Sequence, residues 1–216
     1  ILIYRNQRTR ENQAGFRPGY SCVDHIFSLR QILELYHEFR QPIYVAFLDF
    51  SAAFDSVDRQ SLWKLLRYDG LPPKLCSIIQ ALYKNTTSQV SVYNRLSDKI
   101  SISTGVRQGS IISPILFNLC MNNILSSSLD STVGGVTLFP SGSRITDLTY
   151  ADDVAVLAES QKHLHEMIDN IDFAAKKDWS YRVPNQPQIT KQIEKVEVFT
   201  YLGSQISENG SSYGKI

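Results

Sequence analysis

Two short apolar runs joined by acidic residues constrain this chain more than any other feature. Residues 145–149 and 154–158 are the runs, and they flank Tyr150, Ala151, Asp152 and Asp153. Runs of this length predict strands, and two adjacent aspartates suit a tight turn, because successive strand side chains point to opposite faces of a sheet. A carboxylate beside buried strands is costly unless it is paired or coordinated. The segment therefore predicts a β-hairpin with two carboxylates at its tip.

A third carboxylate has a similar setting. Residues 43–48 form an unbroken run of β-branched, aromatic and other apolar residues that ends at Asp49, which predicts a strand buried on both faces. If that strand lies beside the hairpin, Asp49, Asp152 and Asp153 converge, and oxygen donors without His or Cys favour Mg²⁺ or Mn²⁺. Two such ions align an attacking and a leaving oxygen for in-line phosphoryl displacement. For the Asp152–Asp153 pair taken alone, an ordinary Asx turn is the alternative.

The rest of the chain alternates helices and hairpins irregularly. Helical spacing covers residues 23–40, 58–68, 73–83 and 161–177, and another helix begins at Ser113–Pro114. Residues 89–94 and 99–103 alternate like the strands of a hairpin with 94–98 as its connection, and 196–206 is a further strand candidate. This order predicts the α+β class with a largely antiparallel sheet.

Composition limits the function classes. The 43% of apolar residues can fill a core, while 22 Lys and Arg against 21 Asp and Glu lack the basic excess usual in nucleic-acid binders. Three widely separated cysteines provide neither a disulfide framework nor a CxxC metal site. No run reaches the roughly 18 to 20 apolar residues of a membrane span, and no signal peptide is evident. We expect no membrane partner and an intracellular location, nuclear or cytoplasmic.

Five segments together resemble reverse transcriptases, in the style of non-LTR (LINE-type) retrotransposons. Residues 47–55 (Phe-Leu-Asp-Phe-Ser-Ala-Ala-Phe-Asp) resemble the A motif, 105–110 with 113–118 the B motif, and 150–153 the C motif. Residues 12–19 (Asn-Gln-Ala-Gly-Phe-Arg-Pro-Gly) resemble a fingers motif, and 199–204 resemble the primer grip. The motifs occur in the family's order, so the resemblance implies an α+β polymerase palm with a central antiparallel sheet flanked by helices.

The resemblance implies an RNA-directed DNA polymerase, a nucleotidyltransferase. Asp49 and Asp152 would hold two Mg²⁺ (or Mn²⁺) ions, with the Phe50 carbonyl as a backbone ligand and Asp153 as the supporting carboxylate. The 3′-hydroxyl of a DNA primer would attack the α-phosphate of a dNTP on an RNA template and release pyrophosphate. Such a reaction depends on positioning and charge neutralisation rather than on a protein nucleophile.

The same resemblance assigns nucleotide contacts. Phe54 would lie under the sugar and exclude a 2′-hydroxyl, although a plain core aromatic is the alternative from spacing alone. Gln108 and Gly109 would approach the incoming nucleotide and the template base, since glycine permits close backbone approach. For these two residues, the alternative is a turn before a helix.

Template and primer contacts complete the implied site. Arg17 would pair with template or triphosphate oxygens, or be a solvated loop arginine. Tyr150 would lie against the primer end, or pack within its hairpin. Leu202 and Gly203 would form the turn that supports the primer strand, or a simple β-turn.

The implied domains are a partial fingers region at 1–42, a palm at 43–207 and a tail at 208–216 leading to a missing thumb. Residues 178–195 lack the lysine-bearing strand usual in the family, which indicates an internal deletion in a truncated domain. A catalytically inactive retroelement-derived nucleic-acid-binding or interaction protein is an alternative. An RNA-templated RNA polymerase is another, and Phe54 argues against it.

Overall fold

A three-stranded antiparallel sheet forms the centre of the computed structural model, which describes residues 9–50, 52–129, 134–178 and 195–207. Its strands lie in the order β1 (Tyr44–Leu48), β9 (Asp153–Ala158) and β8 (Asp147–Tyr150). Leu48 pairs with Val154, and Tyr150 pairs with Asp153. The predicted hairpin and its position beside the strand that precedes Asp49 are both confirmed.

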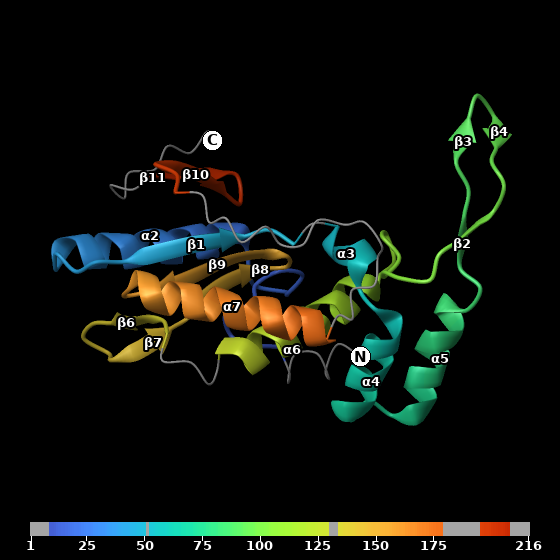
Figure 1. Ribbon diagram of the computed structural model, residues 1–216, viewed down its shortest axis with the longest axis horizontal. Coiled ribbons are helices and arrows are strands. Elements are labelled where there is room, and N and C mark those ends of the chain that lie inside the picture. Colours follow the sequence, from blue (N-terminus) through green and yellow to red (C-terminus); the bar gives the residue numbers. More distant parts are fainter. Residues whose placement is uncertain (1–8, 51, 130–133, 179–194, 208–216) are drawn as a thin grey trace.

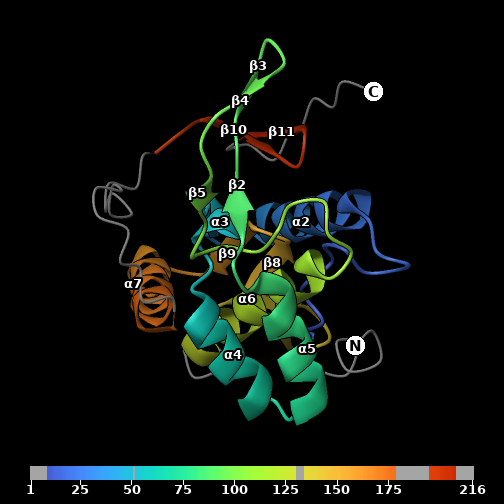
Figure 2. The same ribbon diagram turned by 90° about the vertical axis from the view of Figure 1, so that its right-hand side faces the viewer.

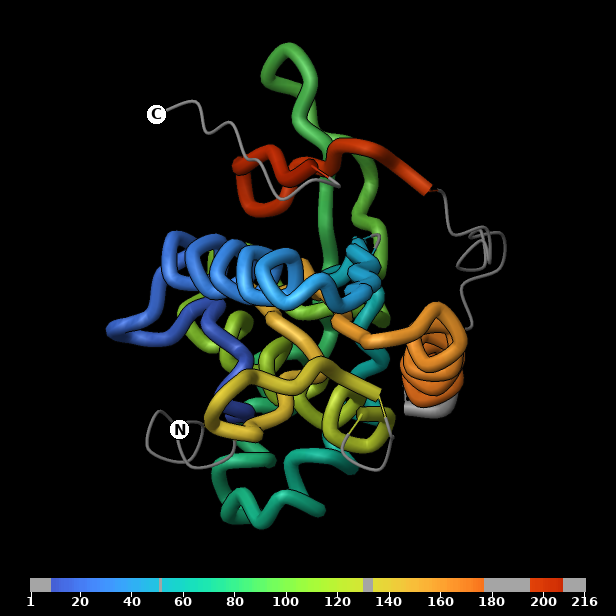
Figure 3. The backbone as a smooth tube through the Cα atoms, turned by 90° about the vertical axis from the view of Figure 1, so that its left-hand side faces the viewer, coloured from blue at the N-terminus to red at the C-terminus, as the bar shows by residue number. Residues whose placement is uncertain are grey.

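Helices cover both faces of this sheet. Val154 and Val156 of β9 pack into the cluster that contains α6 (Ser113–Leu129) and α7 (Gln161–Asp178). The alternating residues Ala155 and Leu157 pack with α2 (Cys22–Glu38). Figures 1 and 3 show α2 on one side of the sheet and α6 with α7 on the other. Because successive side chains of β9 point to opposite faces of the sheet, this strand contributes to both hydrophobic clusters.

The strand buried on both faces is β9, not the one before Asp49. Five of the six β9 residues are buried, whereas only Ala46 is buried in β1 and Tyr44 is exposed. The prediction for residues 43–48 was wrong because β1 is an edge strand and β9 occupies the centre. An apolar run alone does not tell a central strand from an edge strand that packs beneath another element.

Three short helices connect β1 to a projecting hairpin. They are α3 (Ala53–Ser56), α4 (Arg59–Tyr68) and α5 (Pro73–Tyr83). Residues 84–103, here called the arm, extend away from the body through β2 (Thr87–Ser88), β3 (Ser91–Val92), β4 (Arg95–Leu96) and β5 (Ile100–Ser101), as Figures 1 and 2 show. The arm turns at Tyr93–Asn94, since Val92 pairs with Arg95, so the predicted connection at 94–98 was placed too late.

Two further hairpins complete the described structure: β6 (Val136–Leu138) with β7 (Ser143–Ile145), and β10 (Val198–Tyr201) with β11 (Ser204–Ser207). The single strand predicted at 196–206 divides at Leu202 and Gly203, whose φ angles of 49° and 83° turn the chain back. The β10–β11 hairpin is attached to the sheet through Phe199, which stacks on Phe47 at 4.2 Å between ring centroids.

The described part of residues 1–42 packs directly on the central sheet. Leu29, Ile32 and Tyr36 of α2 share one buried cluster with Leu148 and Leu157. A separate fingers unit ending at residue 42 therefore stays a prediction. The irregular segment at 178–195 lies almost entirely outside the described residues, as does the tail at 208–216. No helix in the described ranges is long and apolar enough to cross a membrane.

Candidate active site

Three carboxylates meet at one end of the central sheet. Asp49 comes one residue after Leu48, whose partner is Val154, so Asp49 lies level with Asp153 on the neighbouring strand. Cross-strand neighbours have Cβ atoms about 4.5 to 5.5 Å apart. Burial raises the pKa of Asp153, and the negative charges of Asp152 and Asp49 raise it further. This interaction between the three charges agrees with the predicted convergence of Asp49, Asp152 and Asp153.

The donor chemistry of this end suits a hard divalent cation. Carboxylate oxygens are the ligands that Mg²⁺ and Mn²⁺ prefer, and the repulsion that raises the Asp153 pKa is what such a cation relieves. Within the ranges that the structure describes, however, no three His, Cys, Asp or Glu side chains are arranged to hold a metal ion. The residues therefore fit the ion by charge and donor type, while the two-ion site remains a prediction.

The turn that carries Asp152 has an unusual backbone. Ala151 has a φ of 58°, in the left-handed region that alanine rarely adopts, and it is only 4% exposed. The Gln13 side chain holds both of its peptide groups: Oε1 accepts from the Ala151 N–H at 2.9 Å, and Nε2 donates to the Ala151 carbonyl at 3.3 Å. Gln13 Oε1 also accepts from the Gly15 N–H at 2.8 Å.

The segment that carries Gln13, residues 10–15, is here called the clamp segment. Its backbone is bonded to β8, since the Thr149 N–H donates to Asn12 and the Ala14 N–H donates to Thr149, both at 2.9 Å. Gly15 lies so close to the turn that a Cβ there would be 2.3 Å from the Ala151 nitrogen. Residues of the predicted fingers motif thus extend the central sheet and support the turn that carries Asp152.

A buried ion pair fixes the start of the clamp segment. Asp147 is 0% exposed, and its two oxygens accept from the Arg10 guanidinium at 2.8 and 2.9 Å. Thr146 and Thr149 hydroxyls donate to the same carboxylate, each at 2.8 Å. A buried charge requires such satisfaction, so Asp147 serves to attach the clamp segment to β8.

Phe54 lies between two other aromatic rings. It stacks on Phe117 of α6 at 4.3 Å and meets the edge of Phe16 at 6.1 Å. The ring is only partly buried, so one part of it remains accessible. This position accommodates both the predicted role under a sugar and the core alternative.

Gln108 and Gly109 belong to a loop that is bonded to the Phe54 turn. The Val106 N–H donates to the Phe54 carbonyl at 2.8 Å, and Gln108 Nε2 donates to Asp55 Oδ2 at 3.1 Å. Gly109 has a φ of 80° and open space where a Cβ would be. The structure therefore brings the predicted nucleotide residues together beside Phe54.

The predicted template and primer residues occupy different surroundings. Arg17 donates from Nη1 to the carbonyls of Arg10 and Gln13, at 3.0 and 2.8 Å, and its guanidinium lies 4.1 Å from the Tyr20 ring centre. Arg17 therefore hydrogen-bonds to the backbone of the clamp segment and is not a purely solvated loop arginine.

Tyr150 packs edge-on to His25 at 6.5 Å. His25 is buried. The helix periodicity located α2 correctly, but it did not indicate that this part of the helix lies against β8. Burial lowers the pKa of His25, although the nearby charges of Asp147 and Asp24 act in the opposite direction.

Leu202 and Gly203 form the β10–β11 turn as predicted. The hairpin is tied to the palm by the Tyr201 hydroxyl, which donates to the Leu148 carbonyl at 3.1 Å. Burial raises the pKa of Tyr201, and the charges of Asp153 and Asp147 contribute. The primer-grip candidate is thus attached to β8, the strand that leads to Asp152.

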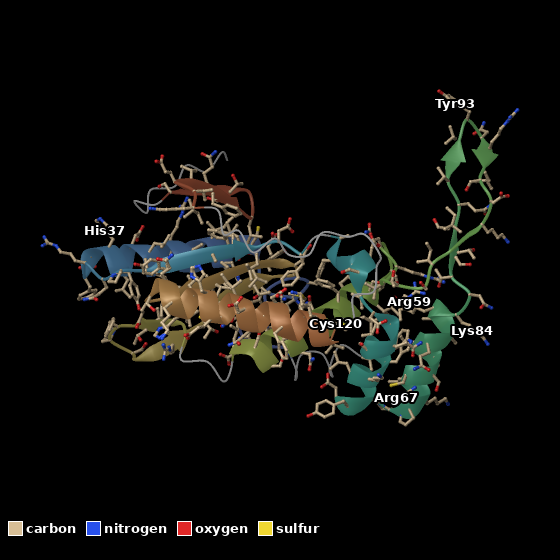
Figure 4. All side chains as sticks on the ribbon, viewed as in Figure 1. His37, Arg59, Arg67, Lys84, Tyr93 and Cys120 are labelled. Carbon is tan, nitrogen blue, oxygen red and sulfur yellow. The ribbon has the colours of Figure 1, made fainter. Side chains whose placement is uncertain are left out.

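Sequence reasoning missed two residues that organise the site. Gln13 was recognised only as part of the motif at residues 12–19, and no short-range pattern indicated its contact with Ala151. Arg59, visible at the base of the arm in Figure 4, is buried and donates to the carbonyls of Gly105 and Ile102 at 2.9 and 2.8 Å. These hydrogen bonds fix the loop that leads to Gln108. Nothing in the sequence around Arg59, a basic residue at the start of a helix, indicated this role.

Comparisons with known proteins agree with this geometry. The family described as reverse transcriptase (RNA-dependent DNA polymerase) matches residues 2–206. The Pol polyprotein of the R2DM retrotransposable element of Drosophila melanogaster is 30% identical over 202 residues, which are 89% of this chain and 18% of that protein. A probable RNA-directed DNA polymerase from the X-element of the same species is 28% identical over 81% of this chain and 18% of its own length.

Among solved structures, the apo telomerase of Candida tropicalis lacking its C-terminal domain superposes with a TM-score of 0.65. It is 13% identical, and the match covers 99% of this chain and 44% of the telomerase, which supports the fold alone. The family match covers nearly the whole sequence and includes the sheet end at which Asp49, Asp152 and Asp153 meet. This chain therefore belongs to the reverse transcriptase family and is a domain of the non-LTR retrotransposon type.

Proposed function

We propose that this chain catalyses RNA-directed DNA synthesis, transferring a nucleotide from a dNTP to a primer 3′-hydroxyl on an RNA template. The observation that carries the proposal is the meeting of Asp49 with the Asp152–Asp153 turn at one end of the β1–β9–β8 sheet. The names of the R2DM and X-element relatives support the same reaction class. Since the chain spans 18% of these two relatives, further activities of the whole proteins are not assigned to it.

In this proposal the carboxylates act through charge and position. Asp49, Asp152 and the Phe50 carbonyl would hold two divalent ions, which when bound neutralise the phosphate charge that develops during transfer. Asp153 would be the supporting carboxylate. It lies close enough to Asp49 and Asp152 for their negative charges to raise its pKa. The chain needs no protein nucleophile, because phosphoryl transfer is accelerated chiefly by alignment and charge neutralisation.

Neighbouring residues would select and align the substrates. Phe54, supported by the Phe117 ring, would lie under the sugar of the dNTP and exclude a 2′-hydroxyl. Gln108 and Gly109 would meet the base pair from the loop beside it. Tyr150 and the Leu202–Gly203 turn would contact the primer, and Arg17 would contact the template or the triphosphate after leaving its two carbonyl partners.

Primer extension on an RNA template by the full-length protein tests the proposal. Asp152→Asn should lower the extension rate by at least about 100-fold, the usual cost of losing one essential charge-stabilising group. Asp98→Asn, in the arm, is the matched control and should extend like the parent. An Asp152→Asn variant that extends normally would contradict the site.

Two further outcomes separate the alternatives. A parent protein that binds RNA tightly but never extends a primer would indicate the non-catalytic role. Equal use of rNTPs and dNTPs would indicate an RNA polymerase instead. Under the proposal, the parent prefers dNTPs, and Phe54→Ala weakens that preference while dNTP extension continues.

A further inference from the structure

The turn at Ala151 and Asp152 is held by the side chain of Gln13, which is distant in the sequence. Its amide is uncharged and takes no part in proton or phosphoryl transfer. Gln13 is buried, and its amide contacts Ala151 through both its oxygen and its nitrogen. The Ala151 N–H belongs to the peptide group before that residue, and its carbonyl belongs to the peptide group after it. One side chain therefore fixes both peptide planes that determine φ and ψ of Ala151.

The hydrogen bonds from Gln13 hold Ala151 in a backbone conformation that is unfavourable for alanine. A residue with a side chain in the left-handed region loses about 1 to 2 kcal/mol relative to the right-handed region. The sequence supplies alanine at this position, rather than the Gly, Asn or Asp that tight turns favour. Without an external partner, the turn would also leave a nearly buried N–H and carbonyl without hydrogen bonds.

The position of Gln13 is itself determined by the sheet. Backbone hydrogen bonds on both sides of it, from Thr149 to Asn12 and from Ala14 to Thr149, hold the clamp segment along β8. Gly15 lets the segment approach the turn, and its carbonyl accepts from Asn118 of α6 at 2.7 Å. The amide of Gln13 is therefore presented to Ala151 from a rigid support.

We propose that Gln13 is a positioning residue for catalysis: by fixing both peptide planes of Ala151, it sets the direction in which the next residue, Asp152, presents its carboxylate. The inference rests on the proposed function for its kinetic consequence. Its structural consequence concerns this chain alone. Loss of the Gln13 amide would leave Asp152 present and charged, but no longer directed by the turn.

Two substitutions in the full-length protein test this role in steps. Gln13→Ala removes all three hydrogen bonds, and Gln13→Glu keeps an acceptor for the N–H groups of Gly15 and Ala151 but loses the donor to the Ala151 carbonyl. Misplacement of a reacting group by about 1 Å costs about 100-fold in rate, so we expect that loss of kcat for Gln13→Ala. Gln13→Glu should lie between this variant and the parent, and KM for dNTP should change less than about threefold.

Two measurements report on the turn without any reaction. Hydrogen exchange at the Ala151 amide should accelerate at least about tenfold in Gln13→Ala, because its acceptor is gone. Binding of Mn²⁺ alone, followed by electron paramagnetic resonance, should weaken about 10-fold or more, as is usual when a partner that orients a metal ligand is lost.

Controls distinguish positioning from a general loss of stability. Tyr36→Phe removes hydrogen bonds to Glu159 and Thr137 away from the turn, and it should keep parent kcat at temperatures where both variants are folded. Gln89→Ala removes a 2.7 Å glutamine-to-carbonyl bond within the exposed arm and should alter none of the three readouts.

An unchanged Ala151 exchange rate in Gln13→Ala, or a kcat loss no greater than that of Tyr36→Phe, would overturn the inference. If the parent extends no primer, the proposed function fails. In that case, amide exchange and Mn²⁺ binding still decide whether Gln13 positions the turn.

Discussion

Among the β-hairpins that turn through two residues, the arm and the β8–β9 hairpin stabilise positive φ angles in opposite ways. In the arm, Tyr93 and Asn94 have φ angles of 47° and 59°, and Tyr93 is 97% exposed at the tip, as Figure 4 shows. In the β8–β9 hairpin, which carries Asp152 and Asp153, Ala151 has a φ of 58° and is 4% exposed. The arm turn contains an asparagine, which suits this conformation by itself, whereas the β8–β9 turn depends on Gln13 and Gly15.

The difference separates a turn made by local sequence from one made by tertiary contact. A locally encoded turn keeps its geometry when its surroundings change, but little fixes where it lies relative to the body. A turn held by a distant side chain has a defined position relative to α6, β8 and the opposing Asp49. Chemistry that requires carboxylates to lie close together needs a turn whose position is fixed by a distant side chain.

The largest effect should come from Gly15→Ala. A Cβ at this position would lie 2.3 Å from the Ala151 nitrogen, a backbone atom that moves only if the turn moves. Overpacking of this kind costs up to about 3 kcal/mol of the free energy of unfolding. Urea unfolding should show the loss as a lower midpoint with an unchanged m value.

Gly19→Ala is the control for the substitution itself, since Gly19 has a φ of 82° but open space around it. Its cost should be limited to about 1 kcal/mol of backbone strain. If Gly15→Ala destabilised the protein no more than Gly19→Ala, close contact between the clamp segment and the turn would be disproved. The double variant Gly15→Ala/Ala151→Gly should recover no more stability than Ala151→Gly adds on its own by relieving the left-handed conformation, because the closest clash is with a backbone nitrogen.

A smaller effect should appear in the pH dependence of stability. Burial lowers the pKa of His25 beside Tyr150, so the folded state keeps a neutral imidazole while the unfolded state takes up a proton near its ordinary pKa of 6.5. Stability from this source is therefore present above pH 6.5 and is lost as the pH falls below it. The free energy of unfolding of the parent should decrease between about pH 7.5 and pH 5.5.

That decrease should be smaller in His25→Gln, as measured by urea unfolding across the same pH range. His37→Gln, at the exposed end of the same helix, controls for the loss of a histidine. An equal decrease in His25→Gln and in the parent would show that the β8–β9 hairpin is not sensitive to this histidine, and would weaken its contrast with the arm.

The smallest effect should come from Tyr93→Asn in the arm. Asparagine tolerates the left-handed region better than tyrosine does, and little side-chain contact is lost at an exposed tip. The global free energy of unfolding should change by less than about 0.5 kcal/mol, while amide exchange within β3 and β4 slows. A larger global change would mean that the arm is coupled to the body and that the comparison does not hold.

Local sequence predicted the parts of the site that local physics determines. Apolar runs located the strands beside Asp49 and Asp152, and the adjacent aspartates located the turn, so their convergence followed from pairing the strands. The same reasoning could not identify β1 as an edge strand, because strand order is a property of the whole sheet. The pattern of residues 196–206 also predicted a single strand, although the resemblance indicated the turn at Leu202 and Gly203, which both have positive φ angles.

The contacts of Gln13 and His25 lay beyond such reasoning for a different reason. Each joins the N-terminal quarter of the chain to β8 or its turn, and no periodicity within either segment encodes the meeting. Arg59 is similar, since its partners at Ile102 and Gly105 are more than 40 residues away. Sequence thus predicted where the carboxylates lie and not which groups hold them in place.

The hydrogen bond between Gln13 and the Ala151 N–H links residues 138 positions apart, so the candidate active site cannot be assembled until a ribosome has synthesised at least residue 151. At about 5 to 20 residues per second, the clamp segment waits on the order of 10 s for the turn that it will hold. Until then its polar groups have no partner in β8. A nascent chain interrupted before residue 151 can contain Asp49 and α2, yet it has no assembled catalytic centre.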